Sequence, residues 1–238
     1  MINFTEIQQF NTVAFDHYLR LPGYSTSFLK KERGGIAHEF VMTDKIRVGS
    51  IVDAILTDPA KVDMADPNFP FARNIAIKIK ETFGDMFKQF IPQVSFTAIA
   101  EHKGFKMPTR GRLDFLLPKM AVIDLKVTYA KDIEALIKFM RYNEQMFLYC
   151  KMAGVTKAYL LVYCVPTKKC SVHFIDCSGD SFWWEEKITM FGTYDAPAEA
   201  EAPLKIIETT VKIKYISPAQ PSLDAPLMKP NNDFLNGK

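Results

Sequence analysis

The chain has 238 residues, of which 48% are hydrophobic and 24% charged, so it has ample apolar material for the core of one domain. Its sequence has no apolar run of the roughly 18–20 residues that a membrane helix needs, and the first ten residues do not resemble a secretion signal. Four cysteines contain no CxxC pair, which speaks against a zinc knuckle or a disulfide framework. We therefore expect a cytoplasmic protein with no membrane partner.

The net charge of +3 is unevenly distributed. Residues 195–238 hold five lysines against six acidic residues, whereas residues 1–194 hold 25 basic against 21 acidic residues. The first part therefore leans towards a polyanionic partner. The excess is too small to identify a nucleic-acid-binding protein by itself.

The first ninety residues are expected to be mainly helical. Apolar residues recur at roughly helical spacing over 4–21, and Pro22-Gly23 ends that pattern. Hydroxyl side chains before residue 28 offer N-caps for a short helix over 27–32, and Thr43 or Asp44 begins a helix over 44–56. The segment 74–90 is helical in pattern, although its first residues alternate like a strand.

The middle of the chain predicts an antiparallel meander of three strands, at 94–100, 110–117 and 121–128, with tight connections. A long helix is expected over 129–153, ended by Gly154. Two more strands, at 158–165 and 170–177, and a helix over 180–191 complete an α/β fold.

The composition changes after Gly192. Segments rich in Ala, Pro, Glu and Asn are typical of a linker and tail, and only 204–216 could form a strand or a docking segment. We expect a folded domain over 1–194, with a helical part over about 1–90 and a core over about 91–194. Residues 195–238 would be the tail.

Asp114, Asp124 and Lys126 lie on two neighbouring strands of the expected meander. Successive side chains of a strand alternate between its faces, so Asp124 and Lys126 point the same way, about 6.6 Å apart. The apolar residues on either side of them point to the other face, and a tight turn can bring Asp114 beside Asp124.

Two carboxylates at close range repel each other unless a cation joins them, and hard oxygen ligands favour Mg²⁺ or Mn²⁺. A lysine beside such a site suits metal-assisted phosphodiester hydrolysis. Gln145 and Tyr149 are four residues apart, so they share one face of the following helix and can bind a phosphate or a carboxylate. Each of these residues alone is more often a solvated charge or a polar helix flank; their order and context favour a single site.

The chain contains Asp114, then Asp124-Leu125-Lys126 ten positions later, and then a Gln-x-x-x-Tyr motif at 145–149. This pattern resembles the PD-(D/E)xK nuclease superfamily in its RecB/lambda-exonuclease branch. The segments 24–31 (YSTSFLKK) and 47–59 (RVGSIVDAILTDP), with Glu101 before GRLDFLL, are similar to the RecE-type phage-recombination exonucleases. The likeness covers about 20–180. It implies a restriction-endonuclease-like core: an antiparallel β-meander, a long helix and further strands, preceded by an N-terminal helical region.

The resemblance implies a role for each matching residue. Asp114 and Asp124 would bind the metal with the Leu125 carbonyl, and Lys126 would be the catalytic lysine. The matching helix would support the site and meet DNA through Gln145 and Tyr149, and Glu101 would be an outer ligand or would shape the lysine's surroundings.

One position departs from the pattern of this branch. In its G-x-x-x-H motif, the histidine position is occupied here by Asp53. Aspartate also binds hard metals, so Asp53 could join Asp114 and Asp124 on the metal. Alternatively, the helix turns Asp53 outward to water or to a lysine.

The implied function is that of a Mg²⁺- or Mn²⁺-dependent DNA exonuclease of the phage recombination or repair type, in a bacterial or phage-infected cell. Its partners would be DNA, further copies of itself and a single-strand annealing protein. Further copies are expected because related exonucleases form toroidal oligomers. Two alternatives stay open: a nuclease-like DNA-binding module with weakened catalysis, and a Cas4-like or endonucleolytic processing enzyme.

Other residues give weaker signals. All four cysteines follow Asp124, so no iron–sulfur cluster of the Cas4 type is expected. The four histidines lack metal-ligand spacing, and Trp183 and Trp184 are expected in the core or at a docking surface more than as a stacking platform. Residues that could line a DNA path, each individually more often a solvated charge, are Lys30, Lys31, Arg33, Arg110, Arg112, Lys138 and Arg141.

Overall fold

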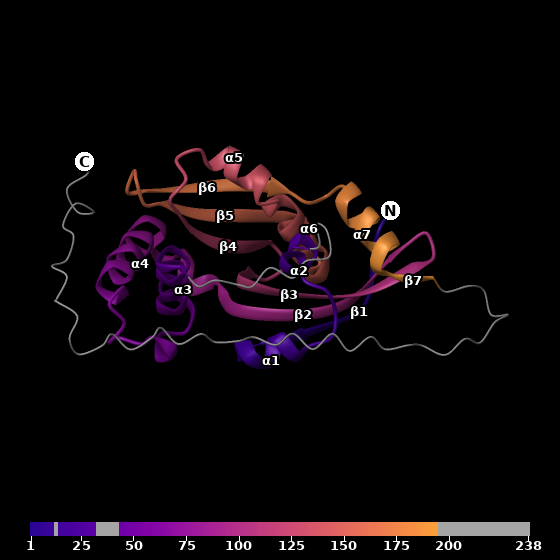
Figure 1. Ribbon diagram of the computed structural model, residues 1–238, viewed down its shortest axis with the longest axis horizontal. Coiled ribbons are helices and arrows are strands. Elements are labelled where there is room, and N and C mark those ends of the chain that lie inside the picture. The colour runs from indigo at the N-terminus through magenta and orange to yellow at the C-terminus, as the bar shows by residue number, and fades with distance from the viewer. Residues whose placement is uncertain (12–13, 32–42, 195–238) are drawn as a thin grey trace, which may run out of the picture. The chain divides into compact units, whose positions relative to one another are not determined.

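The computed structural model describes residues 1–11, 14–31 and 43–194, and the predicted tail therefore lies outside the described residues. One seven-stranded sheet has the order β1-β2-β3-β4-β5-β6, and β7 pairs with β3 off this path (Figure 1). The strands are β1 (Asn3–Phe10), β2 (Ile91–His102), β3 (Phe105–Leu117), β4 (Ala121–Thr128), β5 (Lys157–Cys164), β6 (Lys169–Asp176) and β7 (Thr193–Tyr194). The helices are α1 (Phe15–Arg20), α2 (Thr26–Lys31), α3 (Asp44–Thr57), α4 (Phe69–Phe83), α5 (Ile133–Phe139), α6 (Tyr142–Ala153) and α7 (Phe182–Phe191), with short 3-10 turns η1 (Pro59–Lys61) and η2 (Gly84–Gln89).

The predicted α/β core is confirmed. Strands β2, β3 and β4 form an antiparallel meander, α5 and α6 cross over to β5, which runs parallel to β4, and β6 returns antiparallel. This is the arrangement of a restriction-endonuclease-like core. In the part of the chain that is described, no helix is both long and apolar enough to span a bilayer.

The predicted helix over 4–21 is wrong in its first half. Residues 3–10 form the edge strand β1, which pairs with β2, and only α1 is helical. The register shifts between Thr5 and Gln8, where Glu6 has a positive φ of 51°. This irregularity allows a strand to carry apolar residues three apart, a spacing that imitates a helix.

Two other helix boundaries differ from the sequence prediction. The expected helix over 129–153 is broken into α5 and α6 because Arg141 adopts the left-handed conformation, with φ 49° and ψ 46°. The expected helix over 74–90 begins earlier, at Phe69, and ends at Phe83, where Gly84 has a φ of 54°. Apolar spacing continues through both points, so periodicity alone does not reveal them. The other helices begin and end close to the predicted positions, and Ser25 and Thr43 accept the capping hydrogen bonds of α2 and α3.

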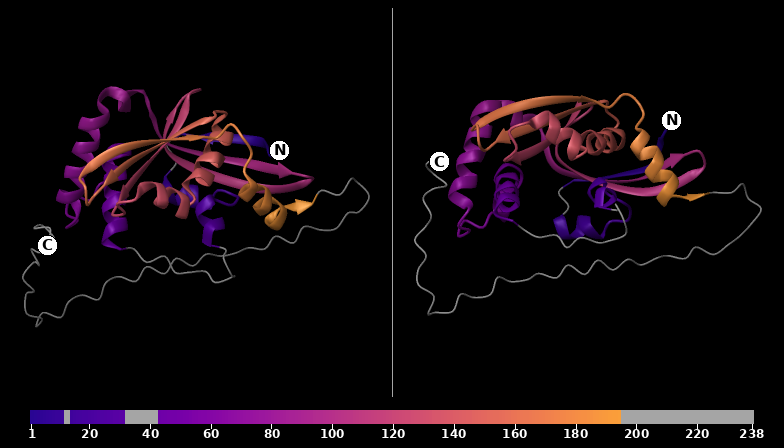
Figure 2. Two further views of the ribbon diagram at one scale, coloured as in Figure 1. Left: turned by 90° about the horizontal axis from the view of Figure 1, so that it is seen from above. Right: turned by 45° about the horizontal axis from the view of Figure 1, so that its top comes forward.

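The sheet is covered by different helices on its two faces (Figures 1 and 2). One core holds Val122 together with residues of α6 and α7, and the other holds Ile123 and Leu125 together with residues of α3 and α4. Alternation along β4 therefore places Asp124 and Lys126 on the same side as Val122, as the sequence predicts.

Strands β3 and β4 separate after a short ladder, and this separation positions the site. They pair only over Phe115–Leu117, although β3 pairs with β2 along nearly its whole length. Helix α6 contacts both strands and also α2, and Figure 1 shows these two helices where β3 and β4 diverge. We call this opening the β3–β4 fork.

The edge of β3 beyond the fork is paired with other segments. Tyr24 forms a parallel bridge with Thr109, and β7 pairs with Phe105 and Lys106. Gly23, with a φ of 107°, is required at this junction because a Cβ atom there would lie 2.7 Å from the Thr109 backbone. The turn before α2 is thereby fixed to the sheet, and α2 is held beside α6.

Candidate active site in the β3–β4 fork

Asp114 lies at the point where the β3–β4 ladder ends. The last backbone pair is Phe115 with Ile123, and beyond it the Asp114 Oδ2 accepts a hydrogen bond of 2.7 Å from the Leu125 amide. The carboxylate therefore takes the role that a strand carbonyl would have had. This contact brings Asp114 alongside Asp124, as the sequence predicts.

Asp124 is buried and has two side-chain partners. Lys126 forms an ion pair with Asp124 Oδ2, and Gln145 Nε2 donates a hydrogen bond of 3.3 Å to Oδ1. Gln145 also donates to the Tyr149 hydroxyl at 3.0 Å. The carboxylate is thus held between β4 and α6 by residues that were expected to share one site.

The position of Tyr149 depends on a glycine in β3. A Cβ atom at Gly111 would lie 2.8 Å from Cε1 of the Tyr149 ring and 3.3 Å from the sulfur of Met152. Such approaches are closer than packed atoms allow, so α6 can pack this tightly on β3 only because residue 111 has no side chain.

Asp53 faces the site and not the solvent. Gln93 Nε2 donates a hydrogen bond of 3.2 Å to its Oδ2, while Oδ1 is buried and has no hydrogen-bond partner among the described residues. Its charge interacts with those of Asp124 and Lys126. Asp53 therefore points towards Gln93 and the fork, and the outward orientation considered for it is not the one observed.

The crowding of carboxylates changes their protonation. Burial, together with the charge of Asp124, raises the pKa of Asp53 to about 6 against the opposing effects of Lys126, Arg112 and the hydrogen bond from Gln93. Burial, followed by the charges of Asp124 and Asp53, raises the pKa of Asp114 well above its usual range. In the absence of a metal, Asp53 and Asp114 therefore keep their protons to a higher pH than carboxyl groups in water do.

Lys126 remains protonated in these surroundings. Burial acts to lower its pKa, but the carboxylates of Asp124 and Asp114 outweigh burial and raise the pKa above the ordinary value of lysine. Lys126 is consequently a fixed positive charge in this state.

A second lysine lies close by, on α2. Lys30 Nζ is 5.4 Å from the centre of the Tyr142 ring, and Lys126 Nζ is 5.2 Å from the same ring. Burial, followed by repulsion from Lys126, lowers the pKa of Lys30 to about 8. The sequence marks Lys30 only as one of several cations that could line a DNA path; its closeness to Lys126 follows from the turn at Gly23.

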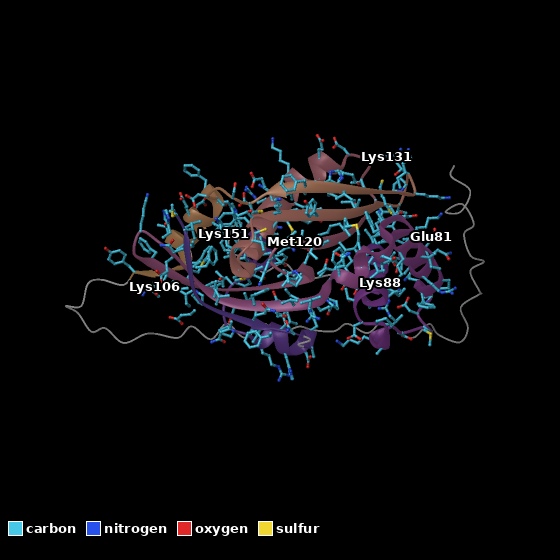
Figure 3. The ribbon with its side chains drawn as sticks, turned by 180° about the vertical axis from the view of Figure 1, so that it is seen from behind. Glu81, Lys88, Lys106, Met120, Lys131 and Lys151 are labelled. Carbon is cyan, nitrogen blue, oxygen red and sulfur yellow. The ribbon has the colours of Figure 1, made fainter. Side chains whose placement is uncertain are left out.

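The structure places Glu101 outside this site. Glu101 pairs with Lys106 near the tip of the β2–β3 hairpin, and Asp114 lies eight positions further along β3 than Lys106. At about 3.3 Å per residue that separation is roughly 26 Å. Figure 3 labels Lys106 at this end and Met120 at the β3–β4 turn. Glu101 was expected near the metal because it precedes GRLDFLL. In the hairpin it lies close to the β2–β3 turn, whereas Asp114 lies far from that turn on β3.

Gln93 is the β2 residue that lies at the site, and the sequence analysis missed it. It donates hydrogen bonds to Asp53 and, at 2.7 Å, to the Thr57 hydroxyl, and it accepts one from Arg112. Arg112 is two residues before Asp114, so strand alternation could have placed it on the same side. Nothing in the local sequence marks Gln93, whose φ of 54° is unusual for a strand residue.

Asp53, Asp114 and Asp124 could hold a divalent metal together with the Leu125 carbonyl, because all of these groups offer hard oxygen donors. The unpartnered Oδ1 of Asp53 and the raised pKa values of Asp53 and Asp114 suit such an ion. Within the described ranges, no three Asp, Glu, His or Cys side chains form a ready-made metal cluster, and Lys126 pairs with Asp124 in this state. The basic residue Arg33 lies outside the described residues.

Comparison with known proteins adds similarity of structure only. No family model and no curated protein matches the chain. A candidate exonuclease from Eubacterium rectale is 18% identical with a TM-score of 0.41, covering 64% of this chain and 65% of its own, so the chain spans slightly less than two thirds of that protein. The protein SSO0001 is 14% identical with a TM-score of 0.38, covering 75% of this chain and 83% of its own. Rai1 of Scheffersomyces stipitis is 14% identical with a TM-score of 0.26, covering 41% of this chain and 25% of its own.

Gly111→Ala tests the contact between β3 and α6. We expect it to lower the free energy of unfolding by about 1–3 kcal/mol, because the added methyl group must displace Tyr149. Gly49→Ala in α3 is the matched control, since its Cβ would meet only Val127 at 3.9 Å. That change should raise stability by about 0.5–1 kcal/mol. Urea denaturation measures both; equal effects of the two substitutions would contradict the close packing described.

Asp53→Asn tests the electrostatics of the site in the absence of metal. Because the folded-state pKa of Asp53 is raised, the contribution of Asp53 to the free energy of unfolding should fall as the pH rises from about 4 to about 6 and then stay level. The variant lacks this loss and should be more stable at pH 7 by up to roughly 3 kcal/mol, the equivalent of the shift from 3.8 to about 6. Urea unfolding in EDTA at pH 4, 5, 6 and 7 measures the difference, which must grow with pH; a difference independent of pH would place Asp53 in water.

Proposed function

We propose that this chain is a metal-dependent deoxyribonuclease that hydrolyses phosphodiester bonds. The observation that carries the proposal is the meeting, in one fork of the sheet, of Asp114, Asp124 and Lys126 with Gln145 and Tyr149 of α6. These are the residues that the resemblance to PD-(D/E)xK nucleases assigns to the site.

The metal would be Mg²⁺ or Mn²⁺, held by Asp114, Asp124 and the Leu125 carbonyl, with Asp53 at the position that is histidine in the resembling family. When bound, such an ion lowers the pKa of a coordinated water and neutralises phosphate charge. The donor chemistry fits because the three carboxylates share one partly buried region and interact with one another. In the described part of the chain, Lys126 forms the ion pair with Asp124.

The protein's own residues would act on the phosphate and on one another. Lys126 carries a fixed positive charge, so its role would be to stabilise negative charge on the attacked phosphate, not to accept a proton. Gln145 would keep the Asp124 carboxylate in one orientation, and Tyr149 would fix Gln145 in turn. Lys30 would attract a neighbouring phosphate from the α2 side.

Within this class we propose an exonuclease of the phage recombination or repair type, which would act on DNA as an oligomer and alongside a single-strand annealing protein. A DNA-binding module with weakened catalysis is the second candidate, favoured by Asp53 at the histidine position. A Cas4-like or endonucleolytic enzyme is the third candidate, and it differs from the proposed exonuclease in whether it needs a DNA end. Linear, nicked and circular duplexes incubated with Mg²⁺, Mn²⁺ or EDTA distinguish the three.

Asp124→Asn and Lys126→Ala should each reduce cleavage of linear duplex DNA by at least about 100-fold, since each removes a charge that would contact metal or phosphate. Glu101→Gln and Lys106→Ala are matched controls at the far end of the β2–β3 hairpin and should cleave at the wild-type rate. Circular dichroism verifies folding. Full activity of folded Asp124→Asn protein would refute the site. Equal losses in the controls would mean that removal of any charge, and not of a site residue, reduces cleavage.

Mg²⁺ or Mn²⁺ should raise the thermal midpoint of the wild-type protein by roughly 5–10 °C at a hundredfold excess over Kd, because only the folded state brings the carboxylates together. Asp53→Asn should reduce this rise and Glu101→Gln should not. Differential scanning fluorimetry with and without EDTA measures the shift. An unchanged rise in Asp53→Asn would remove Asp53 from the proposed ligands.

A further inference from the structure

A cavity of about 620 Å³ lies beside α7, away from the carboxylates of the fork. Its lining comes from the β2–β3 turn, from the junction of α5 and α6, and from α7, and includes His102, Lys103, Arg141, Phe182, Trp183 and Glu185. We call it the α7 cavity. The proposed chemistry at Asp114, Asp124 and Lys126 makes no use of it.

His102 gives this cavity a buried polar group with no hydrogen-bond partner among the described residues. The side chain is 5% exposed, and its Nδ1 has no hydrogen-bond partner among the described residues. The nearest acidic atom, Glu185 Oε1, is 3.8 Å away, which is too long for a hydrogen bond. Buried polar atoms are normally satisfied, so the unpaired nitrogen of a residue that lines the cavity is a partner for a polar group of a ligand.

The same cavity offers aromatic surface. Phe182 is 90% exposed, and the Trp183 ring is only partly buried, with Arg141 5.9 Å and Lys187 5.8 Å from its centre. The adjacent Trp184 is fully buried and donates a hydrogen bond of 2.8 Å to the Glu144 carbonyl. Trp184 therefore anchors α7, and Phe182 stays exposed to a planar ligand beside the Trp183 ring, which Arg141 and Lys187 contact.

Arg141 connects this cavity to the candidate active site. It occupies the left-handed position between α5 and α6, directly before Tyr142, whose ring is contacted by both Lys30 and Lys126. The lining of the cavity thus includes the residue next to Tyr142, which contacts the two lysines of the fork. Arg141 and Lys103 bring positive charge to its lining, while Glu186 is paired with Lys187 at 3.5 Å.

We propose that the α7 cavity binds one nucleotide of a single-stranded DNA segment that leads to or from the cleaved bond. The base would stack on Phe182, its edge would meet His102 and Glu185, and its phosphate would contact Arg141 and Lys103. A base paired within a duplex has neither face free, so this site selects single strands. The identity of the segment as substrate rests on the proposed nuclease function.

Binding of a fluorescein-labelled twelve-residue thymidine oligonucleotide to the full chain, measured by anisotropy in EDTA, tests the cavity without cleavage. Phe182→Ala should weaken binding about five- to 100-fold, the usual range for loss of one stacked base. Phe139→Ala is the matched control, because Phe139 is also highly exposed, at 83%, but does not line the cavity. Phe182 is at the surface, so its removal should leave the thermal midpoint unchanged.

Two further measurements make the outcome decisive. His102→Ala should change the order of affinity for thymidine, adenosine and cytidine oligonucleotides, because it removes a contact to the base edge. Equal affinity of the Phe182→Ala and Phe139→Ala proteins would overturn the proposal. The proposal would also be overturned if Phe182→Ala changed the oligomeric state, detected by light scattering, and left oligonucleotide binding intact. The aromatic face would then be an interface between copies of the chain.

Failure of the nuclease proposal is separable from failure of this one. Lys126→Ala should lose cleavage and keep binding at the α7 cavity. If Lys126→Ala still cleaves while Phe182→Ala loses oligonucleotide binding, the assigned active site falls and the nucleotide site stands. If Lys126→Ala is inactive and Phe182→Ala binds normally, the reverse holds.

Discussion

The early end of the β3–β4 ladder is the constraint on which the rest of the structure depends. Two strands that continued to pair past Phe115 and Ile123 would satisfy their backbone groups with each other and leave no room between them. Because they separate, the Leu125 amide needs an acceptor, and the Asp114 carboxylate supplies it at 2.7 Å. One hydrogen bond thus satisfies the backbone and brings the first acidic group beside the second.

The fork also lets the two layers of helices reach the same point. Gln145 comes from α6, which belongs to the core on one face of the sheet, and Asp53 comes from α3, which packs in the core on the other face. A continuous sheet would keep these side chains on opposite sides. Their charges and hydrogen bonds meet at Asp124 because the sheet is open there. The site is in this sense a property of the sheet's shape, and its residues are scattered along the sequence for that reason.

Sequence reasoning succeeded where local alternation decides the outcome. It placed Asp124 and Lys126 together on β4, opposite Ile123 and Leu125, because side chains on a strand alternate. It failed where one residue leaves the regular backbone: Glu6 in β1 and Arg141 between α5 and α6 have positive φ, and neither is glycine. It also could not find Gln93 or dismiss Glu101, since the register of β2 on β3 determines which β2 residue reaches the fork.

The tight packing of α6 makes the geometry of the fork and that of the site inseparable. Through Tyr149 the helix rests on Gly111 of β3, and through Gln145 it holds Asp124 of β4. A change in the distance between the strands must therefore alter the orientation of the Asp124 carboxylate, because one hydrogen-bonded pair, Gln145 and Tyr149, spans both contacts. Close-packed groups cannot absorb such a change gradually. Gly111 thus sets the distance between α6 and β3 at this point, although it offers no chemical group of its own.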